Sequence, residues 1–452
     1  MDNIAEYIAS YGTSIKYEDL PTEVIHKVKG LLIDTLACAL GGYTSEPCKI
    51  ARRMAARVYP YEMPATVIGS GQQSSVDLAT FANGTMIRYL DLNDGFFSQG
   101  IGHPSDNFAP VLTCADAIHA DGKELITASV LAYEVFCRLS DQFALGVFDQ
   151  ATTGIISCVM GASKILGSSR EQMLEAINLA IAPNISLAQT RFGELSMWKG
   201  CALANAARNA VFAAFLAKEG MTGPNPIFEG HCGFFRAVSG GPFRLEEFGG
   251  KDRPFRIMNT VIKRYPCGLF AQTAIDAAIK LRSKISSVDE IAEINIGTFA
   301  LGKAIMAGDD EKWRPRTRES ADHSIPYVVG ITLMDGALEV KHFDDKYLNN
   351  PALLALIQKI KVEETEECVN LYPDACANRV ELTTKTGEKI SELVQYHRGH
   401  HRNLLTDEEV EDKFHSLAKN LQGPAQRKNL LSLVWNLEEV EDVAKLMQSL
   451  TI

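Results

Sequence analysis

The spacing of apolar residues changes character near Gly220, and this change limits the folds that the chain can adopt. Before that point the chain is rich in Ala and Leu with helical periodicity. One such segment, "PTEVIHKVKGLLIDTLACALGG", starts on Pro-Thr and stops on Gly-Gly. Ala and Gly on several of these segments predict closely packed helices. Farther along, "VDEIAEINIGTFA" and "NRVELTTKTGEKISELVQY" alternate as half-buried strands do, the second with a Thr-Gly hairpin turn.

The two patterns predict a mainly α protein with an α+β second domain. We place a large all-helical domain at residues 1–258 and a smaller α+β domain at residues 259–402, which also holds the helical pattern "IPYVVGITLMDGAL". Residues 403–452 return to amphipathic helix, so we expect them to complete the first domain.

Charge and motif content narrow the classes of partner and cofactor. A net charge of −11 over 452 residues argues against nucleic acid or an anionic membrane, while a small anionic substrate remains compatible with it. No apolar run has the length of a membrane span, and "MDNIAEYIASYG" lacks the features of a secretory signal. The ten cysteines are scattered without a CxxC pair, which is typical of a reduced cytoplasmic protein without a cysteine-based zinc site. Phosphate loops and dinucleotide fingerprints are missing, so we expect no nucleotide cofactor.

The densest polar stretch, "YLDLNDGFFSQGIGHPSDN", stands between two segments that have the pattern of buried helices. Asp91 and Asp94 are three residues apart, and on a helical end a like-charged pair raises the pKa of one carboxyl toward that of a useful base. His103 titrates near neutrality and suits acid–base chemistry. The alternative is a surface loop whose aspartates cap helices.

Cations stand in two further segments. Lys199, in "MWKGCALANAARNA", is predicted at the start of a helix, where backbone N–H groups favour anions. Lys263 and Arg264 precede a Tyr-Pro turn in "KRYPCG". The alternatives are a solvated lysine and an ordinary basic loop.

"RESADHSIPYVVG" places His323 and Tyr327 four residues apart, on one face of a helix that is predicted to start near Ser324. Both side chains can donate a hydrogen bond to a substrate carboxylate. The alternative is a plain helix N-terminus with Asp322 or Ser324 as its cap.

The cluster His397, His400 and His401 in "QYHRGHHRN" is the one histidine-rich segment. It lacks a nearby acidic ligand and is not an HExxH motif, so we interpret it as a basic interdomain hinge and expect no metal. Carboxylate, histidine, tyrosine and isolated cations together suit proton abstraction beside a carboxylate, with cations that hold the arms of a polycarboxylate substrate.

At this point the residues also resemble a known family. "RYLDLNDGFFSQGIGHPSDN" resembles the signature of the MmgE/PrpD family, which includes 2-methylcitrate dehydratases, cis-aconitate decarboxylases and an iminodisuccinate epimerase. "LLIDTLACALGG", "KRYPCGLFAQTAIDAA" and "ADHSIPYVVGITLMDG" are similar to further family segments, in order, and nearly the whole chain is covered. The resemblance implies that the α+β domain is a lid, that the active site lies between the domains, that the protein is a homodimer, and that it uses no metal or nucleotide.

The resemblance also implies roles for residues. Asp91 and His103 match the acid–base residues of the family, Lys199 matches its active-site lysine, and Tyr327 matches an active-site tyrosine. We expect these four to be catalytic, with Asp94, Asp106 and Asn107 holding the loop in shape. We expect the substrate-binding residues to be Lys263, Arg264, His323 and Gln150.

The chain departs from the family pattern at three positions. Gly95 stands where members often carry threonine, Gln150 where many carry histidine, and Gly268 where several carry histidine. Glutamine can hydrogen-bond but cannot shuttle protons. The site therefore holds fewer titratable groups than the resemblance alone implies.

These observations predict a cofactor-independent lyase acting on a small di- or tricarboxylate, of the 2-methylcitrate dehydratase type. Asp91 or His103 is expected to remove the proton α to a carboxylate, the lysines to stabilise the charge that develops, and Tyr327 or protonated His103 to assist loss of the β-hydroxyl. The alternatives are a cis-aconitate decarboxylase or an iminodisuccinate-type epimerase, and a non-catalytic ligand-binding relative.

Overall fold

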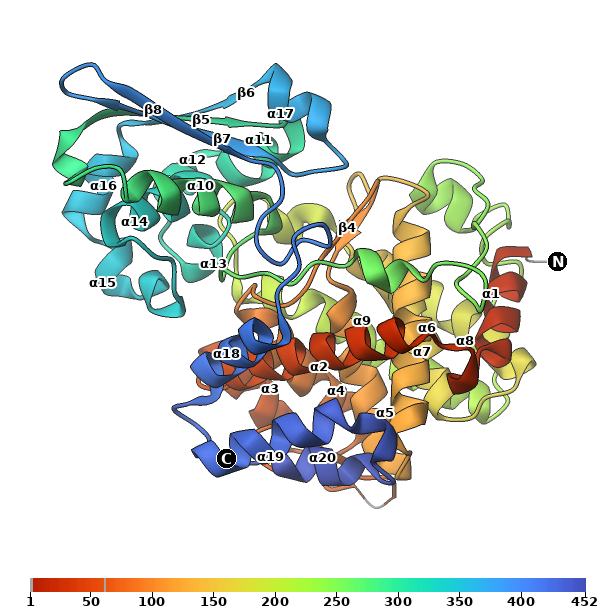
Figure 1. Ribbon diagram of the computed structural model, residues 1–452. Helices are drawn as coiled ribbons and strands as arrows, with labels where there is room; N and C mark the ends of the chain where they lie inside the picture. The colour runs from red at the N-terminus through yellow and green to blue at the C-terminus, as the bar shows by residue number, and fades with distance from the viewer. Residues whose placement is uncertain (1–2, 61) are drawn as a thin grey trace.

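Two large hydrophobic cores organise this computed structural model, shown in Figure 1. The first core draws on residues from Ile4 to Ile262 and again from Val410 to Leu450. The second draws on residues from Tyr265 to Val394. The structure describes residues 3–60 and 62–452, so Met1, Asp2 and Tyr61, which fall in the predicted helical domain, lie outside the described residues.

The first core is built from closely packed helices. Gly84 on α4 (Val76–Tyr89) faces Ala204 on α9 (Ala202–Lys218), and a Cβ added to this glycine would lie 3.0 Å from the Ala204 Cβ. Small residues at such crossings let the helix axes approach, as the composition predicted. The elements are α1 (Asn3–Ser14), α2 (Thr22–Gly42), α3 (Glu46–Ala55), α4 (Val76–Tyr89), α5 (Phe108–Ile118), α6 (Gly122–Ser140), α7 (Ala151–Ile165), α8 (Arg170–Ile181) and α9 (Ala202–Lys218).

A mixed four-stranded sheet and a layer of helices enclose the second core. The strands are β5 (Ile291–Thr298), β6 (Ile360–Glu364), β7 (Asn378–Thr384) and β8 (Lys389–Val394), in the order β6-β5-β7-β8. The β5–β6 pair is parallel and the other two pairs are antiparallel. Helices α10 (Gln272–Arg282) and α14 (Ile325–Asp335) lie under the sheet in Figure 1. The remaining helices are α11 (Ala300–Ala307), α12 (Asp310–Trp313), α13 (Arg318–Ala321), α15 (Asp345–Leu348), α16 (Pro351–Ile357) and α17 (Glu366–Leu371).

The chain then returns to the first core through α18 (Asp407–Ala418), α19 (Pro424–Trp435) and α20 (Val443–Ser449). Thr406 and Glu409 form a capping box that starts α18. Helices α18 and α19 pack against α2, and α20 packs against α5 (Figure 1). Two chain crossings thus join the cores, and the N–H of Ile262 in one donates to the carbonyl oxygen of Gly399 in the other, at 2.9 Å.

The architecture confirms the predicted fold class, a large helical part with a smaller α+β part. The two alternating segments form β5 and the β7–β8 hairpin, and the helix predicted from Pro-Thr to Gly-Gly is α2. Sequence periodicity did not predict β6 or the two-residue strands β1 (Ala65–Thr66), β2 (Gln73–Ser74), β3 (Phe96–Phe97) and β4 (Ile101–Gly102). No helix in the described part of the chain has both the length and the apolar character needed to cross a bilayer.

Candidate active site

The polar stretch lies in the interior, between the end of α4 and the start of α5. Asp91 and Asp94 are fully buried, which rules out the alternative of a surface loop. Asp91 has a φ of 51°, a left-handed backbone conformation that costs free energy for most residues and that aspartate tolerates better than others. Residues in such costly backbone conformations often belong to active sites, so the conformation of Asp91 supports a functional role.

Asp91 is the centre of a buried ion-pair network. Its Oδ1 lies 2.9 Å from an Nη1 of Arg88 and pairs with the ammonium of Lys263. Its Oδ2 lies 3.0 Å from Nζ of Lys199 and 3.2 Å from Nδ1 of His323. Burial by itself would raise the pKa of Asp91, but Arg88 and the two lysines hold it well below its usual range. The carboxylate is therefore charged near neutral pH and is a weak base.

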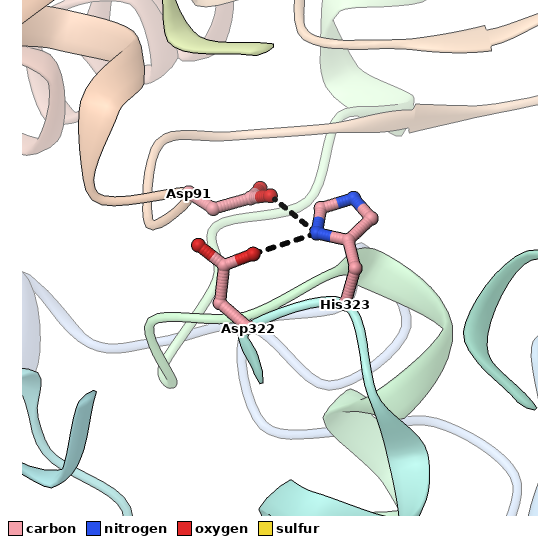
Figure 2. Close-up of side chains that lie close together, drawn as sticks. All are labelled: Asp91, Asp322 and His323. Atoms are coloured by element: carbon pink, nitrogen blue, oxygen red, sulfur yellow. Dashed lines mark hydrogen bonds and ion pairs between the residues drawn. The ribbon is translucent and has the colours of Figure 1, made fainter. Parts of the chain in front are cut away.

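The second carboxylate of the network is Asp322, which precedes α14. It pairs with Lys199, and its Oδ1 lies 2.7 Å from Nδ1 of His323. Figure 2 shows the contacts of Asp91 and Asp322 with the His323 ring. Burial would raise the pKa of Asp322, but Lys199 and the His323 hydrogen bond lower it. Burial, with the nearby Lys199 ammonium, lowers the pKa of His323 to about 4. His323 is thus neutral near pH 7, and its Nδ1 lies within 3.2 Å of both carboxylates and of the Lys199 ammonium.

The contacts of His103 fix the position of its ring hydrogen. Its Nδ1 lies 2.6 Å from the carbonyl oxygen of Asp94, which can only accept, so Nδ1 carries the hydrogen and Nε2 a lone pair. The backbone N–H of His103 donates to Oε1 of Gln150 at 2.7 Å. Burial, with the positive charges of Arg88 and Lys263, lowers the pKa of His103 well below its usual range. The imidazole is therefore neutral and its orientation is fixed.

The other polar residues of the stretch hold the loop in shape, as predicted. Asp94 accepts hydrogen bonds from the N–H of Ser105 and from the hydroxyl of Tyr133, both at 2.9 Å. Burial raises the pKa of Asp94 to about 6, and that of Asp106 to about 7. Asp106 accepts from the amide of Asn93 at 3.0 Å.

Asn107 also holds the loop. It donates to the carbonyl oxygen of Pro104 at 2.8 Å and accepts from Ser157 on α7 at 2.8 Å. The loop is therefore tied both to itself and to the helical core.

Helix α18 also supports the network, although it lies far away in the sequence. Nζ of Lys413 donates to the carbonyl oxygens of Leu92 and Lys263, both at 2.7 Å, and pairs with Asp34 on α2. One lysine thus joins the backbone beside Asp91 to the backbone of Lys263. The C-terminal helices complete the site as well as the core.

A cavity of about 350 Å³ lies between the two cores, beside this network. Arg88, His103, Gln150 and His323 line one side of it. Lys199 and Lys263 are 1% and 0% exposed and lie behind that side with Asp91. This side of the cavity therefore presents the Arg88 guanidinium and two neutral imidazoles, backed by buried ion pairs.

The structure brings together six of the eight side chains predicted for the site and leaves two apart. The Tyr327 hydroxyl donates to the carbonyl oxygen of His342 at 2.6 Å, and its ring lies 5.9 Å from that of Phe343, inside the second core. The reason is that Ser324 caps α14, so the helix starts at Ile325 and His323 precedes it. Arg264 is exposed and lines a different cleft, of about 730 Å³, beside α18.

Sequence reasoning missed two members of the network. Arg88 has the ordinary appearance of a basic residue in the last turn of a helix, and its position three residues before Asp91 was the available signal. Asp322 was considered only as a helix cap, whereas its carboxylate pairs with Lys199.

Asp91, Asp322 and His323 form a group of three potential metal ligands among residues 3–60 and 62–452. The ammonium of Lys199 contacts the donor atom that each of the three would offer. Because this cation lies where a metal ion would bind, the group is better suited to an ion-pair network than to a metal centre.

The three histidines interpreted as a hinge lie on the second chain crossing. The Nδ1 of His400 accepts from the N–H of Arg402 at 3.1 Å, and its ring lies 6.3 Å from that of Phe97 on β3. The cluster therefore borders the hairpin that carries the polar stretch.

Comparison with known proteins gives a consistent result. The model of the MmgE/PrpD N-terminal domain matches residues 5–246, and that of the MmgE/PrpD C-terminal domain matches residues 265–439. Human cis-aconitate decarboxylase is 25% identical, with 99% of this chain and 94% of its own length covered. The 2-methylcitrate dehydratases of Yarrowia lipolytica, a mitochondrial protein, and of Escherichia coli K12 are each 28% identical. They cover 93% and 88% of this chain, and 84% and 86% of their own lengths.

Proposed function

The chain belongs to the MmgE/PrpD family, and on this premise we propose that it is a cofactor-independent lyase of small di- or tricarboxylates, of the 2-methylcitrate dehydratase type. The relatives named 2-methylcitrate dehydratase support the reaction class. The observation that carries the proposal is the neutral imidazole of His103, which lines the cavity with its Nε2 unprotonated.

His103 is the general base in this proposal. Its Nε2 takes the proton on the carbon α to a substrate carboxylate, and the electrons of that C–H bond move toward the carboxylate. Asp91 is less suited to this step, because its carboxylate is saturated with cations and its pKa is held well below the usual range. The two candidates left open by the sequence thus differ in basicity.

Arg88 holds the reacting carboxylate and stabilises its developing negative charge. The guanidinium lines the cavity, and its buried Nε has no hydrogen-bond partner among the described residues. Lys199 and Lys263 do not line the cavity. They pair with Asp91, which fixes the position of this carboxylate, and they offset its negative charge near the reacting carboxylate.

The same imidazole then acts as the acid. Because burial lowers the pKa of His103, the imidazolium formed in the first step gives up its proton readily. It protonates the β-hydroxyl as the C–O bond breaks, so water leaves and a carbon–carbon double bond forms. Catalysis by one group moves the proton between neighbouring atoms on one face of the substrate, which predicts a syn elimination.

The proposal is tested with purified protein, 2-methylcitrate and citrate, by following the absorbance of the conjugated alkene. We expect turnover of at least one of them by the wild type and by His231→Gln, which changes an exposed histidine. A folded protein that turns over neither compound contradicts the dehydratase assignment.

Decarboxylation or epimerisation is the second candidate, since the human relative is a cis-aconitate decarboxylase and each of the three reactions moves a proton beside a carboxylate. Product NMR in deuterated water separates them. Deuterium incorporation without net change indicates epimerisation, and release of CO₂ indicates decarboxylation. A non-catalytic binder would show neither and would keep its ligand affinity in His103→Ala.

A further inference from the structure

Much of the cavity lining is apolar. One wall is formed by Phe148 of the helical part and by Leu269, Phe270, Leu301, Ile305 and Met306 of the α+β part. Leu301 and Ile305 are four residues apart, on one face of α11. This apolar wall, defined by these six residues, runs from buried Met306 to Leu301, which is 37% exposed.

Two glycines leave this wall without polar side chains. A Cβ added to Gly268 would lie 2.8 Å from Cε of Met306, and one added to Gly95 would lie 2.3 Å from Cδ1 of Leu269. A side chain at either position would displace the end of Met306 or Leu269, so the space beside each glycine is filled by an apolar side chain. Gly268, which lines the cavity, adds no hydroxyl or imidazole to it.

The charged residues beside the cavity leave little net positive charge for the carboxylates of a substrate. Three cations, Arg88, Lys199 and Lys263, face the carboxylates Asp91 and Asp322. Nε of Arg88 also lies 4.0 Å from Oδ2 of Asp106, whose pKa is raised by burial to about 7. The cations therefore exceed the charged carboxylates by at most one positive charge. Arg191 also lines the cavity, but its Nε lies 2.7 Å from Oδ2 of Asp149, so this pair adds no net charge.

A substrate carboxylate on Arg88 therefore takes up the available positive charge. Any further carboxylate must stay near the mouth in water, because burial of an unpaired charge against the apolar wall is strongly unfavourable.

From these observations we infer that the preferred substrate carries an apolar arm longer than a methyl group. Its reacting carboxylate lies on Arg88, its α-carbon faces Nε2 of His103, and its alkyl arm lies along the apolar wall toward Leu301. This inference rests on the proposed lyase function and names the substrate class within it. The cavity volume of about 350 Å³ falls within the range, roughly 300–1,000 Å³, of cavities that hold small ligands.

The test is a series of 2-alkylcitrates with methyl, ethyl, propyl and butyl arms. Burial of one methylene contributes about 0.8 kcal/mol, so we expect kcat/KM to rise about three- to fourfold per methylene up to propyl. Turnover of the methyl compound with kcat/KM that falls along the series would overturn the inference and leave the lyase function intact. No turnover of any member would refute the dehydratase function on which the inference rests.

Binding gives a readout that does not depend on turnover. Titration calorimetry with 2-alkylsuccinates, which lack the leaving hydroxyl, should show an affinity that rises about threefold or more per methylene. An affinity that is flat or falling with arm length contradicts the inference whatever the outcome of the turnover assay.

A pair of variants locates the arm. Leu301→Gln should reduce the gain per methylene to less than twofold, because it places an amide on the apolar wall. Val369→Gln is the matched control: this residue is 41% exposed, on α17 of the same part of the chain and outside the cavity. The control should keep the wild-type gain. Equal gains in all three proteins would show that the arm lies elsewhere and overturn the inference.

Discussion

Asp91→Asn is the substitution that removes the centre of the ion-pair network with the least change in shape. Asparagine has the same size and also tolerates the left-handed backbone seen at this position, so the effect reports the charge. Without the carboxylate, Lys199 keeps Asp322, Arg88 keeps Asp106 at 4.0 Å, and Lys263 loses the carboxylate with which it pairs. Removal of one partner from a buried pair costs about 3–5 kcal/mol, and Asp91 pairs with Arg88 and both lysines. We therefore expect a loss of at least about 3 kcal/mol in the free energy of unfolding at pH 7.

Equilibrium urea denaturation, followed by circular dichroism, measures this loss. Asp407→Asn, which changes a carboxylate that is 60% exposed, serves as the control and should leave the midpoint unchanged.

The pH dependence has a definite sign. Because the folded pKa of Asp91 is depressed, its contribution is complete above the unfolded pKa, near 3.9, and is lost as the pH falls below it. The difference between wild type and variant should therefore be largest near neutral pH and shrink below about pH 4. A variant as stable as the wild type at pH 7 would refute the claim that these ion pairs outweigh their desolvation.

Three further predictions follow from the contacts. Gly95→Thr should lower activity and thermal stability, because its Cβ would lie 2.3 Å from Cδ1 of Leu269. The added change Leu269→Ala should restore stability, whereas a Gly95→Thr variant as stable as the wild type would contradict this explanation. Tyr327→Phe should cost about 1 kcal/mol of stability by removing the hydrogen bond to His342, with kcat within about threefold, whereas a hundredfold loss of kcat would restore the catalytic role predicted from sequence. The lowered pKa of His103 predicts that kcat/KM stays flat from about pH 7 down to pH 6.5 and falls only as the base is protonated at lower pH; an acidic limb at or above 6.5 would contradict it.

The fold could be predicted because its signals are long and periodic. The helix α2 and the strands β5, β7 and β8 each carry a repeated pattern over several residues. Each strand of the hairpin β3–β4 has only two residues. A segment this short carries no periodic pattern that could predict a strand.

The site was predictable where a polar residue stands out against an apolar segment. Asp91, His103, Lys199 and Lys263 are of this kind, and the structure places the two lysines on Asp91. Arg88 was missed because a basic residue in the last turn of a helix is common, since its charge interacts favourably with the helix dipole there.

Tyr327 shows the opposite limit. The helix start near Ser324 was predicted, but His323 lies before the cap and outside the helix. The four-residue spacing therefore does not bring His323 and Tyr327 to one face, because that rule applies only within a helix.

The central claim is that Nε2 of His103 removes the substrate proton, and His103→Asn tests it most directly. The asparagine amide can replace Nδ1 as the donor to the carbonyl oxygen of Asp94, so the loop keeps its shape while the base is lost. Deuterium exchange or elimination at the α-carbon, measured by NMR in deuterated water, should fall at least about a hundredfold, with ligand affinity within about threefold of the wild type. Exchange in His103→Asn within tenfold of the wild-type rate would contradict the account.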